Sequence, residues 1–189
     1  MYKLKLLAIA AIAIIGALLI YNHFDHKRQE EPIVDKFISE YNLVSEGHIF
    51  VYSSIDEIIN TLESGTGYIF LCTPESSWCN YYARNLNDVL KSLDVKEIKY
   101  YNIKTDRELN TLKYQRILNI LSPYIFKDDL NNSKLYMPNF TIVKDGEILA
   151  NDNETSLIES DQTEESYWTH ERINEFNNKI TNYVNLLNN

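Results

Sequence analysis

After residue 47 the chain alternates between short apolar runs, typical of buried strands, and longer segments whose apolar residues recur at helical spacing. The predicted strands are His48 to Tyr52, Tyr68 to Cys72, Ile98 to Ile103, Phe140 to Val143 and Ile148 to Ala150. The predicted helices are Ser54 to about Gly65, Trp78 to Leu93, Asp106 to Ile125 and Trp168 to Leu187. This order predicts an α/β fold, a mixed central sheet with helices on both faces.

Two local signals support these boundaries. Ser54 and Glu57 have the spacing of a capping box, in which each residue's side chain accepts a hydrogen bond from the other's backbone N–H. In Lys-Asp-Gly-Glu, between the last two predicted strands, Gly146 can supply the positive φ of a tight hairpin turn.

The first 28 residues are expected to target the chain to a membrane. Lys3 and Lys5 precede an uncharged apolar run from Leu6 to Tyr21, which as a helix would extend about 24 Å, enough to span a membrane with its flanks. The run fits a signal peptide or a signal anchor, and because no small-residue cleavage site follows it, we expect an uncleaved single-pass anchor over residues 1–28. A long domain after a short basic start favours an extracytoplasmic location, although Lys27 and Arg28 partly balance the first charges.

Residues 29–47 are polar and then amphipathic, with Ile33, Phe37 and Tyr41 at helical spacing. This segment is either a stalk or the first helix of the domain. The domain itself is expected to occupy residues 48–189.

Composition narrows the classes of function. The chain is 44% apolar and 24% charged, as expected for a globular domain, and its formal charge of −9 should repel nucleic acid. Its two cysteines cannot form a disulfide-rich framework, and neither has the companions of a zinc site, so no metal or other cofactor is expected.

A longer arrangement resembles the thioredoxin superfamily. It consists of Gly67-Tyr-Ile-Phe-Leu-Cys-Thr-Pro-Glu-Ser-Ser-Trp-Cys79, then a helix, then Met137-Pro138 ahead of a strand. The closest likeness is to small exported thioredoxin-like proteins of Gram-positive bacteria, including bacteriocin transport accessory proteins, whose active loop commonly carries Cys-Pro-Trp-Cys. The likeness covers about residues 48 to 187. It implies a thioredoxin-like fold in which Pro138 is a cis-proline beside the active loop, and in which Trp78, Met137 and Pro138 border a groove for an extended peptide or protein.

The sequence departs from the family's redox motif. Ser76-Ser-Trp-Cys79 occupies the Cys-x-x-Cys position, so Ser76 stands where the family has its attacking cysteine. A serine hydroxyl holds its proton too tightly to replace a thiolate, and no nearby histidine could act as a base. The family's buried acid is also absent from the strand that ends at Cys72.

Three states remain open for the two cysteines. Both Cys72 and Cys79 could be small buried apolar side chains. They could form a disulfide across six intervening residues, or Cys79 could be a functional single thiol at the helix N-terminus.

The segment Asn151 to Ser166 contains six acidic residues and no basic one. Such a run is usually a solvated loop. It replaces a short turn of the thioredoxin pattern on the side where the Ser76 loop is expected, so it could also cap a groove there.

Two functions from different classes follow. One is a membrane-anchored thiol-disulfide protein that acts through Cys79, with Cys72 as a possible partner. The other is a non-catalytic thioredoxin-like module that holds a peptide or protein partner as a chaperone or secretion accessory.

Overall fold

The structure is a computed structural model that describes residues 35–128, 130–154, 158 and 161–188. The predicted membrane anchor at residues 1–28 lies outside these residues. Among the helices that are described, none combines the length and the apolar character that a membrane span requires.

The described residues form a five-stranded mixed sheet in the order β1-β3-β2-β4-β5. The strands are β1 (Phe50–Tyr52), β2 (Gly67–Cys72), β3 (Ile98–Asn102), β4 (Asn139–Lys144) and β5 (Glu147–Asp152). β3 runs parallel to both β1 and β2, whereas β4 is antiparallel to β2 and to β5. The mixed central sheet predicted from the sequence is therefore confirmed.

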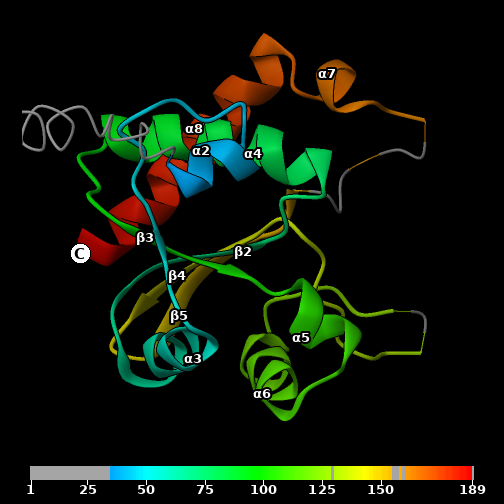
Figure 1. Cartoon of the computed structure of the whole chain (residues 1–189). Coiled ribbons are helices and arrows are strands. Elements are labelled where there is room, and N and C mark those ends of the chain that lie inside the picture. Colours follow the sequence, from blue (N-terminus) through cyan, green and yellow to red (C-terminus); the bar gives the residue numbers. More distant parts are fainter. Residues whose placement is uncertain (1–34, 129, 155–157, 159–160, 189) are drawn as a thin grey trace, which may run out of the picture. The chain divides into compact units, whose positions relative to one another are not determined.

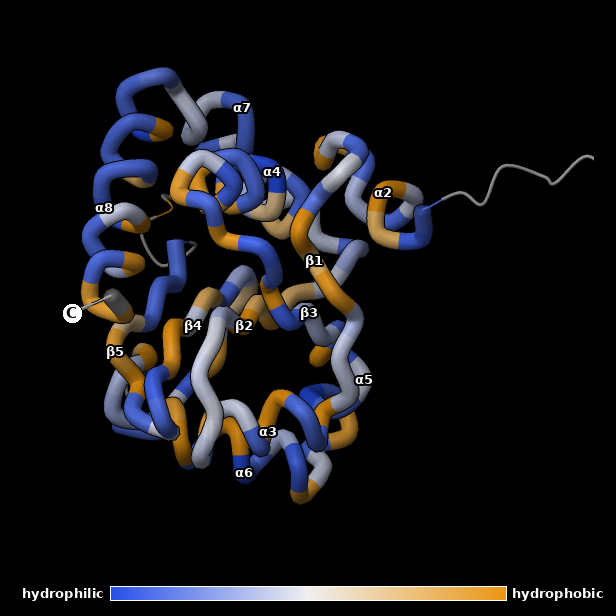
Figure 2. Tube along the Cα trace, turned by 90° about the vertical axis from the view of Figure 1, so that its left-hand side faces the viewer, coloured by the Kyte–Doolittle hydropathy of each residue, from blue (hydrophilic) through white to orange (hydrophobic). Residues whose placement is uncertain are grey.

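Helices cover both faces of this sheet, as expected (Figure 1). They are α2 (Lys36–Glu40), α3 (Ile55–Ser64), α4 (Ser77–Ser92), α5 (Lys104–Glu108), α6 (Leu112–Leu121), α7 (Glu164–Tyr167) and α8 (His170–Asn188). α3 and α6 pack on one face, and α2, α4 and α8 on the other, so the sheet separates two apolar clusters (Figure 2). Both cysteines belong to the cluster under α4 and α8.

Both local signals in the sequence are confirmed. Ser54 and Glu57 form the capping box that starts α3. In the β4–β5 turn Gly146 has a φ of +80°, and its N–H donates to the carbonyl of Gly65 at 2.9 Å. This hydrogen bond ties the hairpin to the end of α3.

The segment before β1 is part of the domain core. Phe37 of α2 and the following Tyr41 are fully buried, and Phe37 stacks on Phe50 of β1 at 4.3 Å between ring centroids. For residues 36–40 the structure therefore has a helix of the domain, one of the two possibilities that the sequence left open.

The prediction of a single helix from Asp106 to Ile125 is wrong. The chain forms α5 and α6 instead, separated by Asn110 with a φ of +46°. The cause is local: the Asp106 carboxylate accepts hydrogen bonds from Tyr101 and Thr111, and Thr111 caps α6 through the N–H of Tyr114. Polar side chains that bond the backbone or one another in this way compete with helix continuation.

The last helix also differs from the prediction. It begins at His170 rather than Trp168, and the short helix α7 precedes it. Thr163 caps α7, so the end of the acidic segment is helical rather than a loop.

Candidate functional site

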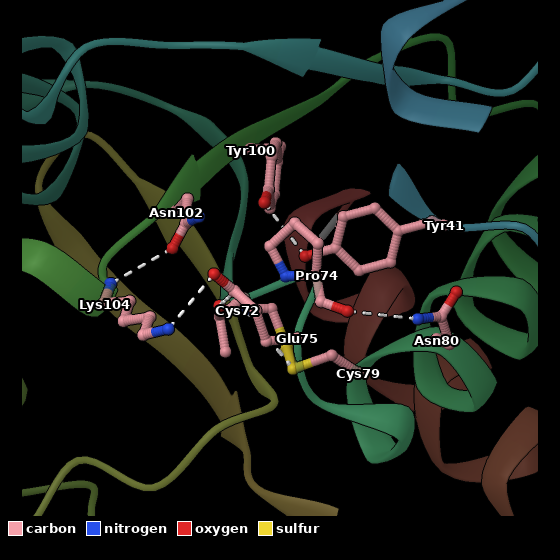
Figure 3. Close-up of a disulfide and its surroundings, with 10 residues drawn as sticks. Tyr41, Cys72, Pro74, Glu75, Cys79, Asn80, Tyr100, Asn102 and Lys104 are labelled. Atoms are coloured by element: carbon pink, nitrogen blue, oxygen red, sulfur yellow. Dashed lines mark hydrogen bonds and ion pairs between the residues drawn. A yellow bond between two sulfur atoms is a disulfide. The ribbon is translucent and has the colours of Figure 1, made fainter. Parts of the chain in front are cut away.

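The structure joins Cys72 and Cys79 in a disulfide, one of the three states that the sequence left open (Figure 3). Cys72 is the last residue of β2, and Cys79 lies in the first turn of α4, with 6.0 Å between their Cα atoms. Both residues have 0% exposure, so the bond is closed to solvent.

The loop inside this disulfide is ordered by its own hydrogen bonds. The N–H of Thr73 donates to Cys79 Sγ at 3.5 Å, and Asn80 Nδ2 donates to the carbonyl of Pro74 at 3.4 Å. Ser76 is the N-cap of α4, but its hydroxyl makes no capping hydrogen bond. The half-buried Ser76 side chain is therefore not committed to holding the helix start.

Glu75, in the same loop, links the disulfide region to the neighbouring strand. Its carboxylate accepts a hydrogen bond from the Thr73 hydroxyl and pairs with Lys104 Nζ at 3.1 Å. These contacts, the one with Thr73 foremost, lower the pKa of Glu75 to about 2. Lys104 follows β3, whose Asn102 lies opposite Cys72 in the sheet. Figure 3 shows this ion pair beside the disulfide.

Pro138 lies next to the strand that carries Cys72, on the side of β2 that is opposite to β3. The Met137–Pro138 peptide is cis, as predicted. β4 pairs with β2 so that Asn139 lies opposite Leu71, and the preceding residue, Pro138, therefore falls level with Cys72. Pro138 is buried and Met137 is half-buried, in contact with both apolar clusters.

The C-terminal end of the acidic segment covers the first turn of α4. The Trp78 ring rests edge-on against Tyr167 of α7, with 5.6 Å between centroids. Ser77 donates a hydrogen bond to Glu164, and the Tyr81 hydroxyl donates to Glu165 at 3.3 Å. In both of these hydrogen bonds a hydroxyl of α4 donates to a carboxylate of α7.

Of the predicted groove residues, Trp78 thus contacts Tyr167 of α7. Met137 and Pro138 directly precede β4, which pairs with β2. Trp78 and Met137 are each only half-buried, so both retain surface that a partner can contact. Tyr82, one turn further along α4, is fully buried and stacks on Phe70 of the sheet.

A buried charge cluster near this site was not found from the sequence. Asp152, at the end of β5, accepts a 2.7 Å hydrogen bond from Tyr82 and pairs with Lys179 at 2.6 Å. Glu154 pairs with the same lysine and accepts a hydrogen bond from Tyr167. The cluster therefore connects β5, α4, α7 and α8.

For one member of this cluster, Asp152, the sequence did contain a signal of burial. Ala150 and Asp152 alternate along β5 and both are buried, with Ala150 in the cluster under α4 and α8. Because alternate residues of a strand face the same side, the aspartate is expected to face the core. Its partners, far along the chain, carried no matching signal.

Burial is the largest single influence on the pKa of both Asp152 and Lys179. It raises the pKa of Asp152, although Lys179 and Tyr82 oppose the shift. Burial lowers the pKa of Lys179, but Asp152 and Glu154 outweigh it, so the lysine pKa is raised overall. Lys179 is therefore a stable cation between two carboxylates, and the cluster carries one excess negative charge when both are ionised.

In the described part of the chain, no group of three or more His, Cys, Asp or Glu side chains is arranged to hold a metal ion.

Comparison with known proteins places the chain in no group. No family model matches it, and neither the curated proteins nor the solved structures contain a match.

Proposed function

We propose that this protein is a thioredoxin-like binding module that holds an extended peptide or protein partner beside Pro138. The strand order β1-β3-β2-β4-β5 and the cis-proline level with Cys72 support this relationship. The partner role is that of a chaperone or secretion accessory, such as a bacteriocin transport accessory protein.

One observation carries the choice of binding over catalysis. Cys72 and Cys79 are bonded to each other at 0% exposure, while the position of the family's attacking thiol holds Ser76. Disulfide exchange requires a thiolate that can reach its target, and access to the sulfur that is attacked. A buried bond without an external thiol is suited to fixing the loop between β2 and α4.

A second candidate function is thiol-disulfide exchange through Cys79. The observation in its favour is the position of the disulfide, with Cys79 in the first turn of α4 and the Thr73 N–H directed at its sulfur. Helix N-termini stabilise thiolates, so a Cys79 thiol released by reduction would be a good leaving group and nucleophile.

The proposal includes a single-pass membrane anchor at residues 1–28 that holds the domain on the extracytoplasmic side. Lys3 and Lys5 ahead of the apolar run from Leu6 to Tyr21 support it. Protease added to intact cells should digest the domain, and protection under conditions that digest a known external protein would contradict this orientation.

The experiment that separates the two functions compares the wild type with the Cys72→Ala/Cys79→Ala double variant. Binding of fluorescein-labelled unstructured peptides is measured by anisotropy, and reduction of insulin is measured in parallel. A binding module should bind peptide with a Kd that changes by less than about threefold in the folded double variant, and should not reduce insulin. Robust insulin turnover that the double variant loses would instead establish the redox function.

A further inference from the structure

A pocket of about 350 Å³ lies next to the candidate site. Its walls are Lys104, Arg107 and Glu108 of α5 and, from the other side, Met137. This volume is at the lower end of the range for ligand pockets, which suits one side chain of a partner better than a whole cofactor.

The pocket adjoins the site on two sides. Met137 directly precedes Pro138 and contacts the apolar cluster that contains both cysteines. Lys104 reaches across to Glu75 inside the disulfide loop. A chain segment held beside Pro138 can therefore place a side chain between α5 and Met137.

The charge of the pocket is unusual for this chain. Two of its four lining residues are cationic and one, Glu108, is anionic, so the lining has one excess positive charge, whereas the whole chain has a net charge of −9. The two acids next to Arg107 in sequence are Asp106, whose carboxylate is already occupied by Tyr101 and Thr111, and Glu108, which is exposed and lines the pocket itself. Within the described part of the chain, the Arg107 guanidinium makes no salt bridge and no side-chain hydrogen bond.

The second cation, Lys104, is only weakly committed. Its partner Glu75 has a side chain that is 58% exposed, and exposed ion pairs contribute about 0–1 kcal/mol. An incoming carboxylate can therefore share Lys104 at little cost, while Arg107 offers the planar fork that binds a carboxylate through two hydrogen bonds.

Two exposed apolar side chains lie where α5 is joined to α6. Leu109 and Leu112, between α5 and the first turn of α6, are 71% and 83% exposed. Leu109 directly follows Glu108 of the pocket wall, so it can contact the apolar neighbours of a side chain held in the pocket.

From this arrangement we propose that the pocket formed by Lys104, Arg107, Glu108 and Met137 selects an acidic side chain, Asp or Glu, in an extended partner segment whose neighbouring residues are apolar. The carboxylate binds the Arg107 guanidinium and is shared with Lys104. Met137 contacts the apolar part of the segment. This inference rests on the proposed binding function and names the chemistry of its partner.

The test uses short fluorescein-labelled peptides that carry a central Glu, Gln or Lys between leucines, titrated with the wild type, Arg107→Gln and Arg116→Gln. Arg116 is a matched control because it pairs with Glu63 on the surface of α3 and α6. We expect the Glu peptide to bind the wild type at least about tenfold more tightly than the Gln peptide, as for hydrogen bonds to charged groups. Arg107→Gln should remove this preference, and Arg116→Gln should leave it intact.

The outcomes separate the two levels of the proposal. Equal binding of the Glu and Gln peptides, or an equal loss for both in Arg107→Gln, would overturn acidic selection while leaving the binding function in place. Binding of none of the peptides would overturn both. A phosphoserine peptide that binds more than about tenfold more tightly than the Glu peptide would replace the carboxylate by a phosphate ester as the ligand.

Discussion

The hydroxyl of Tyr82 donates a 2.7 Å hydrogen bond to the carboxylate of Asp152, which joins the helix that carries Cys79 to the last strand of the sheet. Lys179 and Glu154 extend this contact to α8 and to the segment that follows β5. Because Tyr167 of α7 also bonds to Glu154, one buried cluster holds both α4 and the α7 segment that covers its first turn.

This cluster predicts an unusual dependence of stability on pH. Burial raises the pKa of Asp152 in the folded state, so the folded protein holds this proton more tightly than the unfolded chain. The stabilisation is fully present below the unfolded pKa, for which the ordinary value is 3.8, and it is lost as the pH rises through the folded pKa. Asp152→Asn keeps an acceptor for Tyr82 and removes the excess charge.

We therefore expect the free energy of unfolding of Asp152→Asn to rise relative to the wild type as the pH increases from 4 to 8. Urea unfolding across this range measures the difference. Asp161→Asn, at an exposed aspartate, is the control and should show no such trend. A difference between Asp152→Asn and the wild type that does not change with pH would contradict the shift.

The disulfide predicts a loss of stability when it is removed. Cys72 and Cys79 are seven positions apart, and a loop of this size predicts a loss of about 2 to 3 kcal/mol on opening through chain entropy. Cys72→Ala/Cys79→Ala should unfold at correspondingly lower urea concentration, and the reduced wild type should behave similarly.

Thiol counting by mass provides the independent check. The unreduced protein should take up no alkyl group, whether folded or unfolded, and the reduced, unfolded protein should take up two. Uptake of two groups by unreduced, unfolded protein would show that the cysteines are not bonded.

The β4–β5 turn predicts a difference between two glycines with positive φ. A Cβ on Gly146 would lie 2.3 Å from the carbonyl oxygen of Glu63, whereas on Gly47 the nearest atom would be Lys91 Nζ at 3.9 Å. Gly47→Ala should cost about 1 kcal/mol, the cost of the left-handed conformation alone. Gly146→Ala should cost clearly more, as measured by urea unfolding, and equal losses would contradict the close packing of the hairpin on α3.

The sequence was informative where structure depends on local patterns. The capping box at Ser54, the hairpin turn at Gly146, the order of the five strands and the helices α3, α4 and α8 all follow from spacing within a few residues. The cis peptide before Pro138 was predicted from a family resemblance instead, and the structure has it.

The failures have a common physical cause, which is contact between side chains that are distant or whose orientation is not set by periodicity. The break between α5 and α6 depends on Asp106, whose carboxylate bonds to Tyr101 on β3. Likewise, Lys179 lies 27 positions after Asp152, and only the packing of α8 on the sheet brings them together. The apolar pattern predicted these helices but not their polar partners.

The final prediction concerns Ser76, which occupies the position of the family's attacking thiol. Its carbonyl accepts hydrogen bonds from Cys79 and Asn80 at the start of α4, while its hydroxyl caps nothing. A thiol introduced by Ser76→Cys would therefore be free to react, and the helix N-terminus can increase its thiolate fraction at neutral pH about tenfold by lowering its pKa.

We expect the wild type to show little or no reduction of insulin, and Ser76→Cys to show measurable turnover. The introduced thiolate can attack a substrate disulfide beside Pro138 and release one substrate thiol, and the dithiothreitol of the assay then reduces the mixed disulfide and regenerates the thiol. Ser77→Cys is the matched control: residue 77 is exposed, one position further along, and its native hydroxyl bonds to Glu164. If Ser76→Cys gains insulin reduction and Ser77→Cys does not, a thiol is reactive specifically at residue 76, as proposed. No gain at position 76 in a folded variant would mean that the surface beside Pro138 cannot present a substrate disulfide, whereas robust turnover by the wild type would show that the buried disulfide opens and that Cys79 is a working nucleophile.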